Sequence, residues 1–259
     1  MNARLLQSRL AAAALTRREL IRFIRQPSRV AASIGTPVLL WLFIASGMSR
    51  SFMMPGDAGE HVSYGSYLLP GVVTMTILFS TIFAAISLIQ DRQEGFLQSV
   101  LVSPIPAWAI VASKVLGGAA VATLQAIILL LAAPFIGLEP SFLGLLGAVI
   151  ASALTSIAVV GLGLAAAWWI DSTAGFHGVM NMLLMPMWLL SGALFPVQGS
   201  TPWLRAIVTA NPLHWCHSAI AGSLGVPIAI APISAWLGTI GFALAMFALA
   251  SVVIGLRRS

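Results

Sequence analysis

The residues of this chain that could do chemistry are few, and they lie at the ends of long apolar segments. The acidic residues that could relay a proton or bind a cation all fall at or beyond those ends: Asp57, Glu60, Asp91, Glu94, Glu139 and Asp171. A carrier driven by protons or sodium usually places such a group at mid-membrane. The pattern therefore weighs against a carrier of that kind and against a channel for charged ions.

Two clusters could bind a metal ion. His177 and Met180, with the methionines that follow, offer nitrogen and soft sulfur ligands. Methionine is also a flexible filler of apolar interiors, and we favour that interpretation. His214, Cys216 and His217 form the second cluster, for which an ordinary polar rim among aromatic residues is the alternative. The single cysteine excludes an intrachain disulfide, and we predict no metal site.

No glycine-rich loop ending in Gly-Lys-Ser/Thr occurs in the sequence, so the chain cannot bind ATP in the P-loop manner. We expect no catalytic residue and no cofactor bound by this chain. Any ATP and magnesium would belong to a partner protein.

One polar segment, residues 90–106, could act mechanically. Phe96, Leu97, Val100 and Leu101 recur at the spacing of one helical face, and prolines follow directly. A helix this short and polar cannot span a membrane, so it must lie on lipid or dock on a partner. We interpret it as the docking segment for a soluble protein that supplies energy.

Composition identifies the elements that position this segment. The chain has 259 residues, of which 59% are hydrophobic and 8% charged, whereas a soluble domain carries roughly a quarter charged residues. We predict one all-α membrane domain over residues 1–259, with six spans in residues 30–256. The expected spans are Val30–Met48, Tyr67–Ile89, Trp108–Ile136, Phe142–Ile170, Ala174–Leu194 and Ile233–Leu256.

Residues 1–29 and 195–232 are expected to be helical without spanning. Arg18, Arg22, Arg25 and Arg29 fall on one stripe, which predicts an amphipathic interface helix with arginines toward lipid phosphates. This helix either only sets topology or also touches the soluble partner. Residues 195–232 contain two stretches too short to span and too apolar for a free loop, which favours extracytoplasmic re-entrant helices at Trp203–Val208 and His214–Leu224.

The basic residues predict the orientation. With six spans, eleven of the 13 lysines and arginines lie on the side of the termini, and only Arg50 and Arg205 lie on the other. By the positive-inside rule, both termini and residues 90–106 are cytoplasmic, as in a multi-pass protein of the bacterial inner membrane. The net charge of +6 therefore reports topology, and we expect no nucleic-acid partner.

A polar stripe on the second span could line a pathway. Thr76, Ser80 and Ser87 share one helical face, and Asn181 and Met185 lie on the fifth span. Serine and threonine also pack harmlessly between membrane helices, so both interpretations stay open.

Several motifs, taken together and in order, resemble those of type-2 ATP-binding-cassette (ABC) exporter permeases. The run DRQEGFLQSVLVSPI at residues 91–105 resembles the cytoplasmic coupling segment of that family. SGALFP at residues 191–196, followed by PWL and NPL, resembles its loop before the last span, and RREL leading to RQP resembles its entry helix. The match covers nearly the whole chain.

The resemblance implies a domain that dimerises, with a second permease copy as a homodimer, and binds two cytoplasmic ABC ATPase subunits. It implies a substrate path lined by the second and fifth spans and an outer gate at Phe195 and Pro196. The family often has threonine and a second glutamate where this chain has Phe96 and Gln98, so the ATPase contact is expected to be more apolar here. The expected coupling residues are Arg92, Glu94, Gly95, Phe96, Leu97, Val100 and Leu101.

The subgroup most like this chain includes drug and antibiotic exporters, which implies an amphipathic or hydrophobic substrate, such as a drug, a lipid or a glycan-like molecule. Two alternatives remain. An ATP-independent secondary carrier would transport without any ATPase. A non-transporting assembly subunit would tolerate leucine at Ser80 and Asn181 without loss of export.

Overall fold

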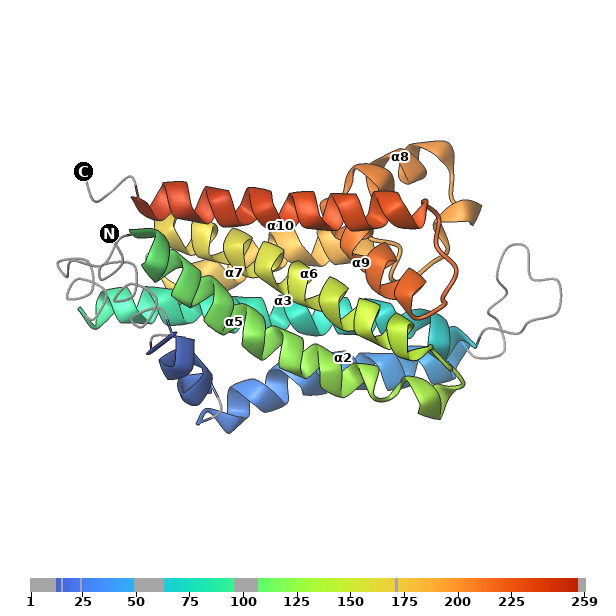
Figure 1. Cartoon of the computed structure of the whole chain (residues 1–259), viewed down its shortest axis with the longest axis horizontal. Helices are drawn as coiled ribbons and strands as arrows, with labels where there is room; N and C mark the ends of the chain where they lie inside the picture. The colour runs from blue at the N-terminus through green and yellow to red at the C-terminus, as the bar shows by residue number, and fades with distance from the viewer. Residues whose placement is uncertain are drawn as a thin grey trace.

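A computed structural model describes residues 13–14, 16–23, 25–48, 63–95, 107–170 and 172–255. Within these ranges the chain is helical and contains no β-strand. The long helices run along one axis, and Figure 1 shows two distinct ends. At one end α3 stops and α5 starts, and we call it the Asp91 end. At the other end α3 starts beside the short helices α8 and α9, and we call it the Tyr64 end.

Five helices are long and apolar enough to cross a membrane. Their number and composition confirm an all-α membrane protein. α7, Thr173–Leu189, has 17 residues and is therefore about 25 Å long, which is shorter than a bilayer core of roughly 30 Å. The sixth span thus stays a prediction. The five candidate spans are α2 (Pro27–Met48), α3 (Tyr64–Gln93), α5 (Ala107–Leu130), α6 (Phe142–Trp169) and α10 (Pro232–Gly255).

The bounds of several helices differ from those predicted, and for α3 and α5 the reasons are local. α3 begins three residues early because Ser63 caps it, with Ser63 Oγ accepting from the Ser66 amide at 3.1 Å. It ends with Gly95 at a φ of 75°, where glycine is favoured. α5 stops at Leu130 and a separate 3₁₀ helix, η1 (Ala133–Ile136), follows, since Pro134 lacks the amide hydrogen that a continuing helix would need.

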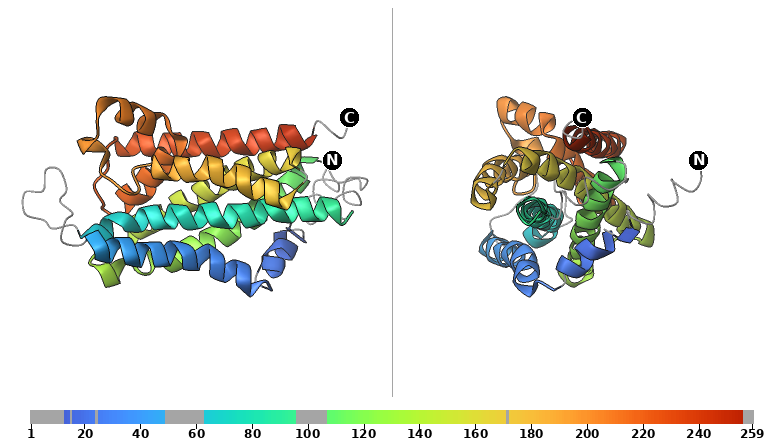
Figure 2. Two further views of the ribbon diagram at one scale, coloured as in Figure 1. Left: turned by 180° about the vertical axis from the view of Figure 1, so that it is seen from behind. Right: turned by 90° about the vertical axis from the view of Figure 1, so that its left-hand side faces the viewer.

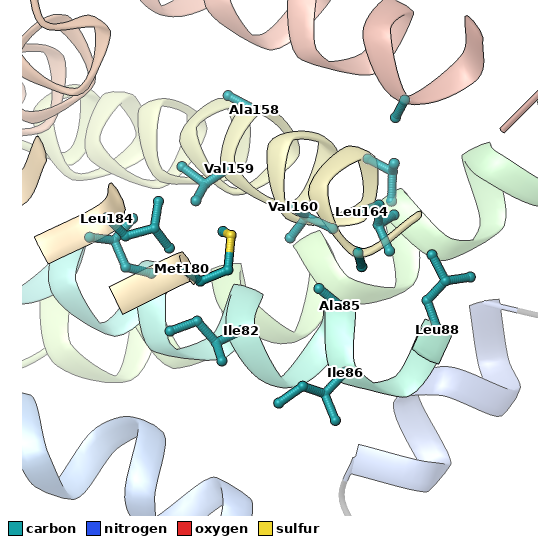
Figure 3. Close-up of a cluster of buried hydrophobic side chains, with 14 of the residues drawn as sticks. Ile82, Ala85, Ile86, Leu88, Ala158, Val159, Val160, Leu164, Met180 and Leu184 are labelled. Carbon is teal, nitrogen blue, oxygen red and sulfur yellow. The ribbon is translucent and has the colours of Figure 1, made fainter. Parts of the chain in front are cut away.

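α3 is the central helix of the bundle. It packs against α2, α5, α6, α7 and α9, and the right-hand view of Figure 2 shows it in the midst of the other helices. Apolar side chains of α3, α6 and α7 meet in the core shown in Figure 3, among them Ile82, Leu164 and Leu184. Gly163 brings α6 close, because a Cβ there would lie 2.8 Å from Thr81 Cγ2. Such close packing holds helices together where no water is present to drive association.

The segment after α7 contains η2 (Val197–Gly199), α8 (Pro202–Ala210) and α9 (Pro212–Ser223). Two short helices therefore lie where the sequence indicated them. α9 is buried against α3, α6 and α10, with Cys216 beside Thr155 and Thr239. That these helices re-enter a membrane from outside stays a prediction.

Candidate functional site at the Asp91 end

Asp91 lies in the last turn of α3 and binds three cationic side chains. Its carboxylate is fully buried. Arg18 donates to both of its oxygens at 3.2 Å, Arg22 donates at 2.7 Å, and Lys114 of α5 donates in close contact. Asp91 thereby joins three segments that are far apart in the sequence.

Glu19 is the second anion of this cluster. It accepts from Lys114 Nζ at 2.6 Å, from Ser87 Oγ at 3.0 Å and from Arg18 at 3.3 Å. Three cations face two carboxylates, so almost every buried charge has an opposite partner, as burial requires. Burial alone would lower the pKa of Arg18, but its bonds to Asp91 and the nearby carboxylates raise that pKa above its ordinary value. Arg18 therefore stays charged.

The N-terminal helix, residues 16–23, packs directly on α5. Thr16 Oγ1 donates to the Ser113 carbonyl at 3.3 Å, and Gly117 makes room because a Cβ there would lie 2.9 Å from Glu19 Cβ. Arg29, at the start of α2, donates to Gln90 Oε1 at 3.2 Å. The predicted arginine stripe is thus turned largely inward: Arg18, Arg22 and Arg29 bind α3 side chains, whereas Arg25 is exposed.

Three of the predicted coupling residues fall within the described chain. Arg92 donates to the carbonyls of Trp168 and Ile170 at 2.9 and 2.8 Å, so it holds the end of α6. The Glu94 side chain is 62% exposed, and its carboxylate lies 4.0 Å from Arg22. Gly95 ends α3. The remaining four, Phe96, Leu97, Val100 and Leu101, lie outside the described residues.

This arrangement can transmit a displacement. Asp91 lies shortly before residues 96–106 and Lys114 shortly after them, and their contact ties the two ends of that segment together. Arg18 and Arg22 add the N-terminal helix to the same point. A force applied to the segment would therefore reach α3, α5 and the N-terminal helix together.

Comparison with known proteins identifies the family to which the chain belongs. A family model described as "ABC-2 type transporter" matches residues 11–224, which include the N-terminal helix, the Asp91 cluster and α9. The chain belongs to this family. It is therefore a transmembrane permease subunit of an ABC transporter, and the family implies an ABC ATPase partner.

Individual relatives agree with this assignment. A transport permease of Porphyra purpurea, ycf38, is 28% identical over 211 residues, covering 80% of this chain and 71% of its own. The Streptomyces coeruleorubidus protein "Daunorubicin resistance ABC transporter permease protein DrrB1" is 24% identical, covering 79% and 70%. The Escherichia coli K12 protein "Probable multidrug ABC transporter permease YbhR" is 30% identical, covering 60% of this chain and 42% of its own.

The permease does not bring its predicted pathway residues onto one surface. Ser80 and Ser87 line a cavity of about 30 Å³ beneath the N-terminal helix, together with Glu19 and Lys114. The hydroxyls of Thr76 and Ser80 are buried, and no side chain or carbonyl of the described chain pairs with them. On α7, by contrast, Asn181 is exposed and Met185 is half-buried. The polar stripe of α3 thus faces the interior of the permease, and the pathway stays a prediction.

His177 and Met180, considered above as metal ligands and not favoured, have other surroundings in the permease. Met180 packs among Val159, Ile82 and Leu184 in the core (Figure 3), and the His177 ring lies nearly perpendicular to the Phe83 ring, with 6.4 Å between the ring centroids. Across the described ranges, no three His, Cys, Asp or Glu side chains gather as a metal site would require.

Sequence reasoning missed Glu19 and Lys114 as site residues. A signal was present, since Glu19 is the lone acidic residue in a strongly basic stretch and Lys114 is the sole lysine of the chain. Nothing in the local pattern, however, pairs either residue with Asp91, because the three lie on separate elements.

Proposed function

We propose that this permease is the membrane subunit of an ATP-driven exporter in the bacterial cytoplasmic membrane. It moves an amphipathic or hydrophobic substrate, such as a drug, lipid or glycan-like molecule, out of the cytoplasm or the inner leaflet. Two permease copies form a homodimer, and two cytoplasmic ATPase subunits, which bind ATP and magnesium, supply the energy. Family membership and the printed names of YbhR and DrrB1 support this proposal.

The Asp91 cluster is the observation that carries the proposal. It is a buried, multiply bonded junction directly beside residues 96–106, and it ties those residues to α3, α5 and the N-terminal helix. An exporter driven from outside the chain requires a connection between its docking segment and its membrane helices, and this junction provides one. ATPase closure would push residues 96–106, and the junction would pass that movement into the bundle.

The charge distribution supports the proposed orientation. Within the described ranges, the Asp91 end holds seven of the eight basic residues, and Arg205 alone lies at the Tyr64 end. The Asp91 end is therefore proposed to be cytoplasmic. Glu94, exposed at that end, would face the ATPase.

The test uses the permease with its ATPase in lipid vesicles, and measures ATP hydrolysis and ATP-dependent movement of daunorubicin as a probe. Glu94→Arg combined with Leu97→Asp should abolish stimulation of hydrolysis and probe movement, because a charge reversal and a buried charge would disrupt docking. Glu139→Arg, a matched reversal at an exposed carboxylate of the Tyr64 end, should leave both unchanged. Normal hydrolysis by the docking variant, or probe movement without any ATPase, would overturn the proposal.

A further inference from the structure

The chain turns sharply where α7 ends, and we call residues 190–195 the outer turn. Its peptide carbonyls accept hydrogen bonds from side chains of other elements. Tyr67 Oη donates to the Gly192 carbonyl at 2.6 Å, and Tyr64 Oη donates to the Leu194 carbonyl at 2.9 Å. Both tyrosines belong to the first two turns of α3.

α9 provides the other bonds to this region. Asn211 Nδ2, at the N-cap of α9, donates to the Leu190 carbonyl at 2.9 Å and to the Met187 carbonyl in the last turn of α7 at 2.6 Å. His214 Nδ1 lies 2.7 Å from the Ser191 carbonyl. Four of the six carbonyls of the outer turn are therefore bonded to α3 or α9 side chains.

Burial explains why these donors are needed. A helix that stops leaves its last carbonyls without intrahelical partners, and a buried carbonyl without a partner costs free energy where no water can reach it. Gly192, with a φ of 89°, breaks the helical path, and Ser191, Gly192 and Ala193 are all buried. Side chains of α3 and α9 satisfy the backbone that the turn exposes.

The turn also packs tightly on α3. A Cβ at Gly71 would lie 2.7 Å from Ala193 Cβ and 3.0 Å from the Ala193 carbonyl oxygen, so only glycine allows this approach. Trp188 Nε1, in the last turn of α7, donates to the Gly71 carbonyl at 2.8 Å. Residues 64–71 of α3 thus hold the outer turn by hydrogen bonds and by close contact.

α3 connects this turn with the ion cluster at the opposite end. It is one continuous helix of 30 residues, about 45 Å long, with Pro70 inside it, and it carries Tyr64 and Tyr67 near its start and Asp91 near its end. α3 packs against five other helices along its length, so a displacement at Asp91 would be passed along it toward the outer turn.

We propose that Tyr64 and Tyr67 are positioning residues that fasten the outer turn to α3, so that the turn moves with α3 during ATP turnover. Movement of α3 would then shift the outer turn at the Tyr64 end of the bundle. The end of α7 would move with it, because Trp188 is bonded to the Gly71 carbonyl of α3. This inference rests on the proposed function, because it takes the movement to begin at the docking segment.

The experiment reports on the outer turn with a cysteine. Phe195→Cys places a thiol in the turn at a half-buried position, and the native Cys216 is buried, so it contributes little background. The rate of maleimide labelling is measured in vesicles holding the permease and its ATPase, with and without ATP, and ATP hydrolysis is followed in parallel. With the tyrosines intact, we expect ATP to change the labelling rate.

Tyr64→Phe with Tyr67→Phe removes the two donors and keeps the rings. We expect loss of the ATP-dependent change in labelling while hydrolysis continues, which a merely structural role would not produce. Ser152→Ala is the matched control, since its hydroxyl bonds only the Ala148 carbonyl of its own helix at 2.7 Å. That control should keep the ATP-dependent change.

Gly71→Ala tests the same fastening by a different perturbation. The added methyl should push the outer turn off α3 and raise labelling in the absence of ATP. Gly241→Ala is its control, because a Cβ there meets no atom within 4 Å, and labelling should stay as in the parent.

The outcomes separate this inference from the proposed function. If the permease does not stimulate hydrolysis by its ATPase, the proposed function fails. If hydrolysis is stimulated but labelling of the parent does not respond to ATP, the proposed function stands and the inference is wrong. If the parent responds and the double phenylalanine variant responds equally, the proposed function stands and the fastening is wrong. A parallel fall in hydrolysis and labelling response would also overturn the inference, because it would indicate general loss of structure.

Discussion

Replacing Asp91 by asparagine tests whether the buried ion cluster stabilises the permease. The side chain keeps its size and loses its charge, so Lys114, whose side chain is only 8% exposed, retains Glu19 as its sole carboxylate partner. Arg18 and Arg22 also lose their main partner, but they are 35% and 21% exposed, and solvent screens much of that loss.

The expected magnitude follows from these exposures. Removing one member of a buried ion pair costs about 3–5 kcal/mol, and the partial exposure of both arginines favours the lower limit, about 3 kcal/mol. For a chain of this size each kcal/mol lowers the thermal midpoint by roughly 2–4 °C, which gives a decrease of about 6–12 °C. Glu139→Gln is the control, since that carboxylate is exposed at the other end of the bundle and should change the midpoint little.

Thermal unfolding of the purified permease in lipid nanodiscs provides the measurement, and Lys114→Met completes a double-mutant cycle. Each single variant leaves the remaining member of the pair with fewer opposite charges around it, whereas the double variant removes both members. The double variant should therefore lose less than the sum of the singles, with a coupling of about 1–3 kcal/mol. Additive losses, or an Asp91→Asn midpoint equal to that of the control, would refute the reasoning.

Three other substitutions test separate contacts by the same measurement. Arg92→Gln should destabilise the permease by about 2 kcal/mol, because it removes charged donors from two carbonyls at the end of α6. Gly161→Ala should cost about 1–3 kcal/mol, since its Cβ would lie 2.9 Å from the Met246 carbonyl oxygen on α10. Asn211→Ala should cost about 2 kcal/mol through loss of the α9 cap and of its two donated bonds. Thr201→Ala, at an α8 cap position without a side-chain bond, should change almost nothing.

The helices could be predicted from the sequence because each is a long apolar run, and such runs in a membrane must satisfy their own backbone. Local signals also explain most of their ends, as with Ser63 before α3 and Pro134 after α5. The length of α7 was harder to predict, since the apolar run continues to Leu194 while the helix stops at Leu189. Its end depends on bonds from Asn211 and the tyrosines of α3, which no local pattern contains.

The candidate site was predictable in position and not in chemistry. Periodicity placed Arg18, Arg22 and Arg29 on one stripe of a single helix, whereas in the structure Arg18 and Arg22 belong to the helix of residues 16–23 and Arg29 belongs to α2. The partner of these arginines was misjudged, because an isolated basic amphipathic helix looks the same whether it faces lipid phosphates or buried carboxylates. The partner, Asp91, lies 73 residues beyond Arg18, and only the packed bundle brings the two together.

The separation between Arg18 and Asp91 also bears on how the permease is made. A ribosome produces Arg18 and Arg22 well before Asp91, with α2 and most of α3 in between. While α2 is being inserted, these arginines carry full, unneutralised charge and can hold the start of the chain on its side of the bilayer. Once α3 is complete, Asp91 can pair with the same two arginines as the protein folds. We therefore expect each arginine to act twice during biogenesis, first on the direction of insertion and later on the docking of the N-terminal helix.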